Sequence, residues 1–126
     1  PSIRALGFVD DGTRDGLLAH ARALVVPSPY ESLSMVLLEA WNRGVPALVN
    51  GACRPLAGQV HRANGGLSYR LGREFAEGLS YLLSHPAERA AFGKAGLAYV
   101  EREYRWPSVL ARVEAVLGAI RQNRIS

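Results

Sequence analysis

One stretch in the first half of the chain constrains the fold more than any other. An apolar run over residues 23–26 is long enough for one buried strand. The prolines in residues 27–29 end that strand, because proline cannot donate to the hydrogen bonds of a sheet. Ser32 or Ser34 can then cap a helix that Gly44 closes. This order of strand, turn and helix predicts an α/β fold with an anion site at the turn, because free backbone N–H groups and the positive end of the helix dipole point there.

Two carboxylates flank the predicted start of this helix. Glu31 precedes or occupies the cap and would face the cleft above the strand ends, whereas Glu39 lies on the second helical turn. If the amides between them hold an anion, these carboxylates accept hydrogen bonds from neutral hydroxyl groups, such as those of a sugar or a ribose. The spacing alone leaves a second interpretation open, in which Glu31 is solvated and Glu39 is a surface residue of an amphipathic helix.

The residues PSPYESLSMVLLEA, at 27–40, and the GVPALV that follows soon after resemble the donor-site signature of a known enzyme family. The family is the retaining, nucleotide-sugar-dependent glycosyltransferases of group 1, which are family 4-like and have the GT-B fold. Its two glutamates are separated by seven residues, as Glu31 and Glu39 are here. The resemblance runs over residues 3–106 and implies that Glu31 is the catalytic-site carboxylate that contacts hydroxyls of the donor sugar. It implies that Glu39 holds the ribose hydroxyls of the nucleotide.

The resemblance also implies backbone contacts to the donor. The sugar and the diphosphate would be received by the amides of Leu33, Ser34, Met35 and Val36. One departure affects these contacts: after the first glutamate the family usually has glycine, an aromatic residue and glycine, whereas this chain has Ser32, Leu33 and Ser34. Since serine has a narrower range of backbone conformations than glycine, the positions of the individual amides depend on the local backbone here.

Further donor contacts are implied near the start of the chain. The loop after Gly7 would border the nucleotide base, with backbone contacts from Val9 and hydrogen bonds accepted by Asp11. Guanine presents two N–H donors on one edge, which makes a GDP-sugar a reasonable donor. The alternative is that Asp11 belongs to an Asp-Gly turn that only reverses the chain. For Arg54 both a phosphate contact and a solvated side chain stay open.

The remaining pattern predicts a Rossmann-like α/β domain, a parallel sheet flanked by helices, as in the C-terminal part of the second GT-B domain. Strands are expected over residues 3–9, 47–49 and 67–69, in addition to residues 23–26. Residues 51–58 have little regular pattern and are expected to form a loop.

Helices are predicted in much of the rest of the chain. Thr13 is expected to cap the first of them. Helical spacing continues from Leu71, a further helix starts at Pro86, and Tyr104 and Trp106 are expected to anchor the chain by packing. The apolar positions expected to face the core are Leu17, Leu18 and Ala21, then Phe75, Leu79, Leu82 and Leu83, then Ala90, Ala91, Leu97 and Val100.

Two parts are predicted: a donor-binding part over residues 1–106 and a terminal helix over residues 107–126 with a strong apolar face. By resemblance, that helix would cross back to an N-terminal domain that binds the acceptor. The family also has upstream strands with an arginine and a lysine that neutralise the departing diphosphate, and nothing here stands in for them. The chain is therefore expected to be a fragment, inactive alone, whose sheet is completed by the missing N-terminal domain or by a second copy of the chain.

Composition narrows the possible partners. The net charge is +4, and Lys94 is the only lysine among 15 basic residues. Because these residues are spread along the chain, no nucleic-acid partner is expected. The single cysteine, Cys53, argues against a disulfide framework or a zinc cluster and fits a cytoplasmic setting. No apolar run reaches the roughly 18 residues of a membrane span, and Arg121 and Arg124 leave attachment to the inner face of a membrane open.

Together these features predict the donor-binding part of a transferase. It would move a hexose from a GDP- or UDP-sugar to a hydroxyl acceptor with retained anomeric configuration, and neither a metal nor another cofactor is expected. A sugar phosphorylase, a nucleotide-sugar epimerase and a non-catalytic α/β binding module remain as alternatives. A glycoside hydrolase would not explain the anion site at the helix start. A receiver domain needs an aspartate after Asp15, and a dinucleotide-binding oxidoreductase needs a GxGxxG, and the chain has neither.

Overall fold

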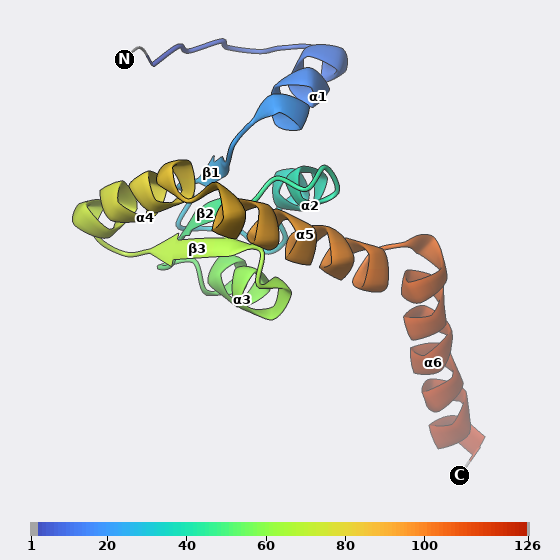
Figure 1. Ribbon diagram of the computed structural model, residues 1–126. Coiled ribbons are helices and arrows are strands. Elements are labelled where there is room, and N and C mark those ends of the chain that lie inside the picture. The colour runs from blue at the N-terminus through green and yellow to red at the C-terminus, as the bar shows by residue number, and fades with distance from the viewer. Residues whose placement is uncertain (1–2, 126) are drawn as a thin grey trace.

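A computed structural model describes residues 3–125 and contains a three-stranded parallel sheet surrounded by helices (Figure 1). The sheet order is β1-β2-β3, with β1 at Leu24–Val26, β2 at Ala47–Asn50 and β3 at Gly66–Tyr69. This arrangement confirms the predicted Rossmann-like α/β fold. The helices are α1 (Asp11–His20), α2 (Met35–Trp41), α3 (Arg54–Ala63), α4 (Gly72–Ser84), α5 (Pro86–Glu103) and α6 (Trp106–Ile125).

The three strands lie within a residue of the ranges expected at 23–26, 47–49 and 67–69. Both strand pairs are parallel, with Val26 opposite Val49 and Asn50 opposite Tyr69. Each parallel connection runs through a helix, α2 between β1 and β2 and α3 between β2 and β3. The carboxyl ends of the strands therefore lie at one edge of the sheet, and the loops that follow β1 and β2 are neighbours there.

The central strand β2 divides the core between two faces of the sheet. Ala47 and Val49 belong to the main buried cluster, which collects side chains from α2, α3 and α5. Leu48 faces the opposite side, where α4 approaches it at Gly78. Because β2 is covered on both faces, Ala47, Leu48 and Val49 are all apolar and do not alternate with polar residues as in a half-exposed strand.

Trp41 is the largest side chain of the core and is fully buried. Its indole N–H donates to the carbonyl of Gly65 at 2.9 Å, and its ring meets the ring of Tyr99 edge to face at 5.7 Å. Two glycines of α5, Gly93 and Gly96, let this helix lie close to α2, because a Cβ on either would collide with Gly44 or with the Trp41 ring. The predicted inward positions of α5 were in part wrong: Val100 is buried, but Ala90 and Ala91 are exposed.

The strand expected over residues 3–9 is not present. The described part of this segment has no helix or strand, and the side chains of Ile3 and Phe8 are fully exposed. A strand forms only when a neighbouring strand pairs with it, and the three described strands pair only with one another. The prediction of a strand over residues 3–9 was therefore wrong: the segment pairs with none of the three described strands, although β1 has a paired neighbour on one side only.

The start of α1 also differs from the prediction. Asp10, not Thr13, is the cap, since its carboxylate accepts a hydrogen bond from the Thr13 backbone N–H at 2.7 Å. Of the positions expected to face the core, Leu18 is buried and Leu17 is half-exposed. Ala21 packs with Leu18 against α2.

Helix α3 replaces most of the loop expected over residues 51–58. Pro55 lies in the first turn of this helix, where its missing N–H costs no intrahelical hydrogen bond. Its inward residues Leu56, Gln59, Val60 and Ala63 follow helical spacing. The helices expected from Leu71 and from Pro86 are confirmed as α4 and α5. In α4, Leu82 is buried, Phe75 and Leu79 are partly buried, and Leu83 is exposed.

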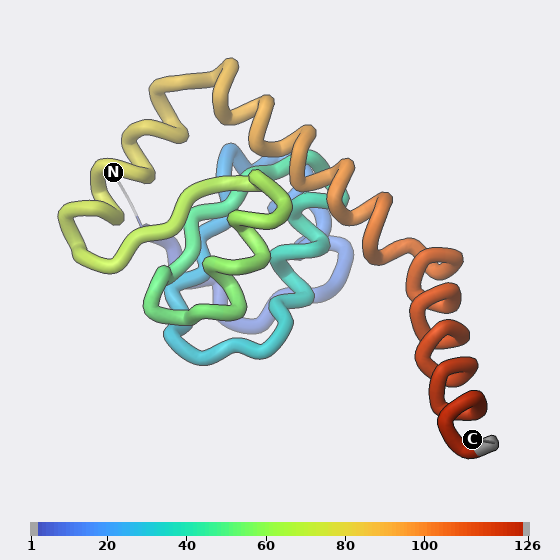
Figure 2. Tube along the Cα trace, turned by 90° about the horizontal axis from the view of Figure 1, so that it is seen from below, coloured from blue at the N-terminus to red at the C-terminus, as the bar shows by residue number. Residues whose placement is uncertain are grey.

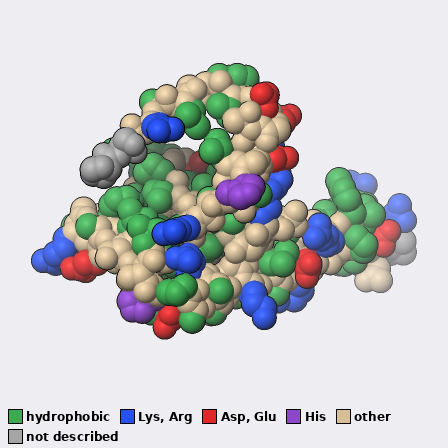
Figure 3. All heavy atoms as spheres, turned by 45° about the horizontal axis from the view of Figure 1, so that its top comes forward, with side chains coloured by type: hydrophobic (Ala, Val, Ile, Leu, Met, Phe, Trp, Pro, Cys, Tyr) green, Lys and Arg blue, Asp and Glu red, His purple; other side chains and the backbone are tan. Residues whose placement is uncertain are grey.

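Helix α6 extends away from the sheet in two perpendicular views (Figures 1 and 2). Its apolar face is about half-exposed, and Figure 3 shows hydrophobic side chains on the visible part of this helix, with charged side chains beside them. The exposed members are Leu110, Val113, Val116, Leu117 and Ile120. At the start of this helix Trp106 is exposed and does not act as the expected anchor, whereas Tyr104 packs against the main core.

Candidate functional site

The segment of residues 27–34, here called the Glu31 loop, connects β1 to α2 and contains the predicted sugar contact. It ends at Ser34, which is 2% exposed and whose hydroxyl accepts a hydrogen bond from the Leu37 N–H at 3.3 Å. Of the two serines that could cap the helix, Ser34 is therefore the cap, and Ser32 is exposed. The N–H groups of Met35 and Val36 lie in the first turn, where an α-helix offers them no partner.

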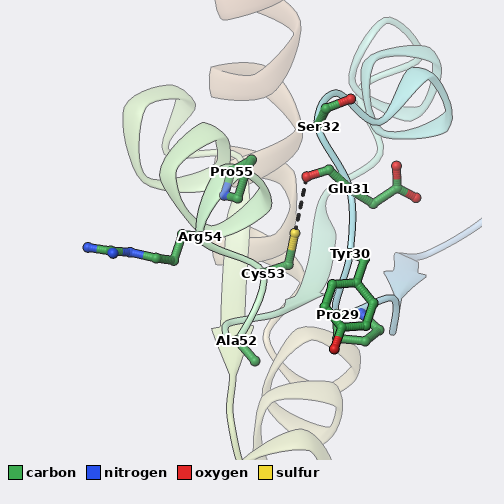
Figure 4. Close-up of a pocket in the computed structure, with 8 residues that line it drawn as sticks. All are labelled: Pro29, Tyr30, Glu31, Ser32, Ala52, Cys53, Arg54 and Pro55. Carbon is green, nitrogen blue, oxygen red and sulfur yellow. Dashed lines mark hydrogen bonds between the residues drawn. The ribbon is translucent and has the colours of Figure 1, made fainter.

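Glu31 lies at the rim of an open hollow of about 560 Å³ between the Glu31 loop and the start of α3. Its carbonyl oxygen accepts a hydrogen bond from the Cys53 thiol at 3.5 Å, and its carboxylate points away from Cys53 and Pro55 (Figure 4). Arg54 extends in the opposite direction from that carboxylate. Glu31 is partly buried, and Arg54 makes no contact with its carboxylate.

Glu39 lies on α2 and contacts a cation that the sequence did not suggest. Its carboxylate is 3.7 Å from the guanidinium of Arg14 in α1, and the same guanidinium is 3.6 Å from the Asp11 carboxylate. One arginine thus brings together the residues predicted for the ribose, Glu39, and for the base, Asp11. Arg43 fixes the same region, with its guanidinium 3.1 Å from Asp15 and donating to the Glu39 carbonyl at 3.0 Å.

The cap of α1 orders the chain beside Asp11. The hydrogen bond from the Thr13 backbone N–H holds the pKa of the Asp10 carboxyl below its ordinary value. Val9, the other residue predicted to contact the base, directly precedes this cap and is partly buried. Val9 and Asp11 therefore lie at the N-terminal end of the helix whose Arg14 reaches Glu39.

The residues with predicted backbone contacts lie on two sides of α2. Leu33 and Met35 have exposed side chains and line a groove of about 290 Å³ that also includes Glu39 and Tyr104. Val36 points to the other side and packs against the cluster of α1 and α2. The start of α2 thus lies between Glu31 and Glu39 as predicted, but no contact joins the two carboxylates.

Three residues near the predicted contacts were missed at the sequence level. Asn50 and Cys53 hold the Glu31 loop, and Arg14 contacts Glu39. Asn50 carried one usable signal, since an amide side chain directly after a buried strand lies at the edge where ligands bind in α/β sheets. Nothing local distinguishes Arg14 or Cys53, because both contacts join segments far apart in the sequence.

Among the described residues there is no group of three histidine, cysteine, aspartate or glutamate side chains that could hold a metal ion. Within the same residues, none of the helices combines the length and the apolar character needed to cross a membrane. Arginine and lysine side chains are scattered over the face seen in Figure 3 without forming one basic patch.

Comparison with known proteins gives one match. The family model described as glycosyl transferases group 1 matches residues 1–98 of the 126. No curated protein and no solved structure matches the chain.

Proposed function

The chain belongs to the group 1 glycosyltransferases, and from this premise we propose that its Glu31 loop and α2 bind a nucleoside diphosphate sugar donor. The observation that supports this most directly is that the Asp11 and Glu39 carboxylates both contact the Arg14 guanidinium, which links the start of α1 to the second turn of α2. Arg14 thus brings together two carboxylates that are 28 positions apart in the sequence. In this proposal the nucleoside binds beside these two carboxylates, and its diphosphate extends to the start of α2.

In this proposal each group has a defined role. Glu39 accepts hydrogen bonds from the ribose hydroxyls, and Arg14, by contacting one of its carboxylate oxygens, leaves the other oxygen for the ligand. Val9 and Asp11 border the base. Glu31 accepts hydrogen bonds from hydroxyls of the donor sugar and orients it without attacking it.

The start of α2 receives the anionic part of the donor. The amides of Leu33, Ser34, Met35 and Val36 surround the point where the helix dipole is positive, and they stabilise negative charge there. When the bond between sugar and diphosphate breaks, charge grows on the diphosphate oxygens and on an oxocarbenium-like sugar. Fixed amides favour that state because they need no reorganisation as the charge develops.

The reaction proposed is transfer of a hexose to a hydroxyl acceptor with retained configuration, in a GT-B enzyme. No step of it uses a metal or another cofactor. The acceptor, and the cations that neutralise the leaving diphosphate, would be bound by a further domain.

The open edge of β1 supports such a partner. Within residues 3–125, β1 pairs with β2 on one side only, so its other edge presents N–H and C=O groups that no described strand pairs with, and proteins usually cover such an edge. We propose that a strand of an N-terminal domain, or of a second copy of the chain, pairs with this edge.

Titration calorimetry with UDP, GDP and ADP tests the proposed site. Glu39→Gln should weaken binding of the preferred nucleotide by about 10- to 100-fold, because hydrogen bonds to a charged group contribute about 1.5–3 kcal/mol. Glu77→Gln is a matched control, since Glu77 is an exposed glutamate of α4. Equal affinities for the two variants would contradict the role of Glu39, and absence of binding to all three nucleotides would contradict the donor site.

A further inference from the structure

Two side-chain hydrogen bonds join the Glu31 loop to the segment that follows β2. The Asn50 side-chain amide donates to the Pro27 carbonyl at 3.0 Å, and the Cys53 thiol donates to the Glu31 carbonyl at 3.5 Å. Asn50 is itself oriented, because its side-chain oxygen accepts a hydrogen bond from the Ala52 N–H at 2.9 Å. Both acceptors are backbone carbonyls of a segment that has no helix or strand of its own.

A third attachment holds the Glu31 loop at its C-terminal end. Ser34 is buried and caps α2, so it anchors the loop to a helix that places Leu37, Leu38 and Trp41 in the core. Inside the loop, the Ser28 hydroxyl bonds the Tyr30 carbonyl at 2.9 Å. The loop is thus held at its start, its middle and its end, and Glu31 is the residue at the middle attachment.

The direction of the Glu31 side chain follows from this attachment. Figure 4 shows the Glu31 carbonyl directed at Cys53 and the Glu31 carboxylate directed away from Cys53 and Pro55. Because carbonyl and side chain belong to one residue, fixing the carbonyl limits rotation of the backbone that aims the carboxylate. A carboxylate held in place beforehand loses less freedom when it binds a sugar.

Cys53 acts on this loop and not on its own helix. It is the N-cap residue of α3, a position that favours Ser, Thr, Asp or Asn, yet it makes no side-chain hydrogen bond to the helix. The thiol is 2% exposed and donates to Glu31 instead. The Cys53 side chain therefore contributes to the main core cluster and to the attachment of the Glu31 loop, and not to capping.

We propose that Asn50 and Cys53 are positioning residues that aim Glu31 at the donor sugar. This inference rests on the proposed function, in which Glu31 contacts the sugar. The sugar contact at Glu31 and the ribose contact at Glu39 are then held in different ways. Glu39 lies on α2 and is aligned by Arg14 and by the core, not by the hydrogen bonds of Asn50 and Cys53. Loss of the two hydrogen bonds should affect the sugar and spare the nucleotide.

The test compares Asn50→Ala and Cys53→Ala with Val60→Ala. Val60 is 4% exposed and lies two turns along the same helix from Cys53, so its truncation also loosens the core but leaves the Glu31 loop untouched. For each variant, the affinity for UDP-glucose is compared with that for UDP, and the affinity for GDP-mannose is compared with that for GDP. Each loop variant should bind the sugar nucleotide about fivefold more weakly, which is the net effect of one lost hydrogen bond, and bind the free nucleotide unchanged. The Val60→Ala variant should leave the ratio of sugar-nucleotide affinity to nucleotide affinity unchanged in both pairs.

A second measurement does not depend on any ligand. Backbone ¹⁵N relaxation of Ser28 and of residues 30–33 should show lower order parameters in Asn50→Ala and Cys53→Ala than in the parent and in Val60→Ala. Order parameters that match the parent, or an unchanged ratio of sugar nucleotide to nucleotide affinity, would overturn the positioning role. If the parent protein binds none of the four ligands, the proposed function fails, and the relaxation data alone decide whether the loop is held in this way.

Discussion

Gly93 offers the sharpest test of how α5 packs against the helix that carries Glu39. A Cβ placed on Gly93 would lie 2.8 Å from the carbonyl carbon of Gly44 and closer still to its oxygen, whereas ordinary contact begins at 3.4 Å. The obstacle is backbone, so no side-chain rotation can relieve it. Gly93→Ala therefore forces α5 away from the end of α2.

Two opposing terms set the size of the effect. Alanine is about 1 kcal/mol better than glycine inside a helix, whereas an inserted methyl group in a tightly packed site costs about 1–3 kcal/mol or more. With a rigid backbone as the obstacle, the upper part of that range applies, and we expect a net loss of about 2 kcal/mol. Gly118→Ala is the matched control, because Gly118 is inside α6 and no atom lies within 4 Å of its added Cβ.

Urea unfolding measures the difference between these variants. With a slope of about 2 kcal/mol per molar, Gly93→Ala should lower the midpoint by about 1 M, and Gly118→Ala should raise it by up to about 0.5 M at unchanged slope. A Gly93→Ala protein as stable as the Gly118→Ala protein would refute the close approach of α5 to Gly44. The packing that places α2 beneath α5 would then have to be different.

Three further predictions concern the core, the first helix and the last helix. Trp41→Phe should lower the free energy of unfolding by about 2 kcal/mol, because it removes the buried indole hydrogen bond to the Gly65 carbonyl, which keeps only the one from the Ala47 N–H, and opens space in the core; urea unfolding measures this. In the parent protein the Thr13 amide resonance should move as the pH falls below about 4. Because the pKa of Asp10 is lowered in the folded state, the cap is intact above the ordinary aspartate pKa. The cap is lost as the pH falls through the lower pKa of the folded state. Leu117→Ser should change the free energy of unfolding by less than about 0.5 kcal/mol, because Leu117 is 51% exposed.

Each of these three has a clear opposing result. A Trp41→Phe protein within about 0.5 kcal/mol of the parent would mean that the indole hydrogen bond is not buried. The Asp10→Asn variant keeps a capping oxygen without a titrating group, so a pH response of Thr13 in that variant would rule out Asp10 as its source. A loss of about 2 kcal/mol or more for Leu117→Ser would show that the apolar face of α6 is packed against another surface.

Much of the fold follows from local patterns in the sequence. Residues 24–26 and 47–50 form strands because short apolar runs there are bounded by proline and glycine, and both strands are covered by helices. Ser34 caps α2 because its side chain supplies the acceptor that the first turn needs. Such features depend on neighbours in the sequence and can be predicted without a structure.

The errors arise where tertiary contacts decide the outcome. Residues 3–9 have strand composition, but a strand needs a partner, and no sequence pattern within that segment supplies one. The helix at Arg54–Ala63 was missed because residues 51–58 show little regular pattern by themselves, although Leu56 and Val60 repeat at helical spacing. In that case the helical signal extends beyond the segment for which a loop was predicted.

The candidate site also contains residues that local patterns in the sequence predict and residues that only the structure reveals. Glu31 and Glu39 could be selected from the motif around them, because their spacing and the capped helix between them are local features. The contact between Arg14 and Glu39 could not, since it requires α1 to pack on α2, and neither could the hydrogen bond from Cys53 to Glu31. The residues that hold the site in place thus became visible only in the folded chain.

In the proposed site, Glu39 binds the ribose of a nucleoside diphosphate donor. Saturation-transfer NMR of the protein with UDP, GDP and ADP tests it most directly, beside a Glu39→Ala control. We expect saturation of the ribose protons for at least one nucleotide, with loss of that signal in Glu39→Ala. Ribose signals of equal strength in the parent and in Glu39→Ala would contradict the assignment of this carboxylate, and silence with all three nucleotides would contradict the donor site itself.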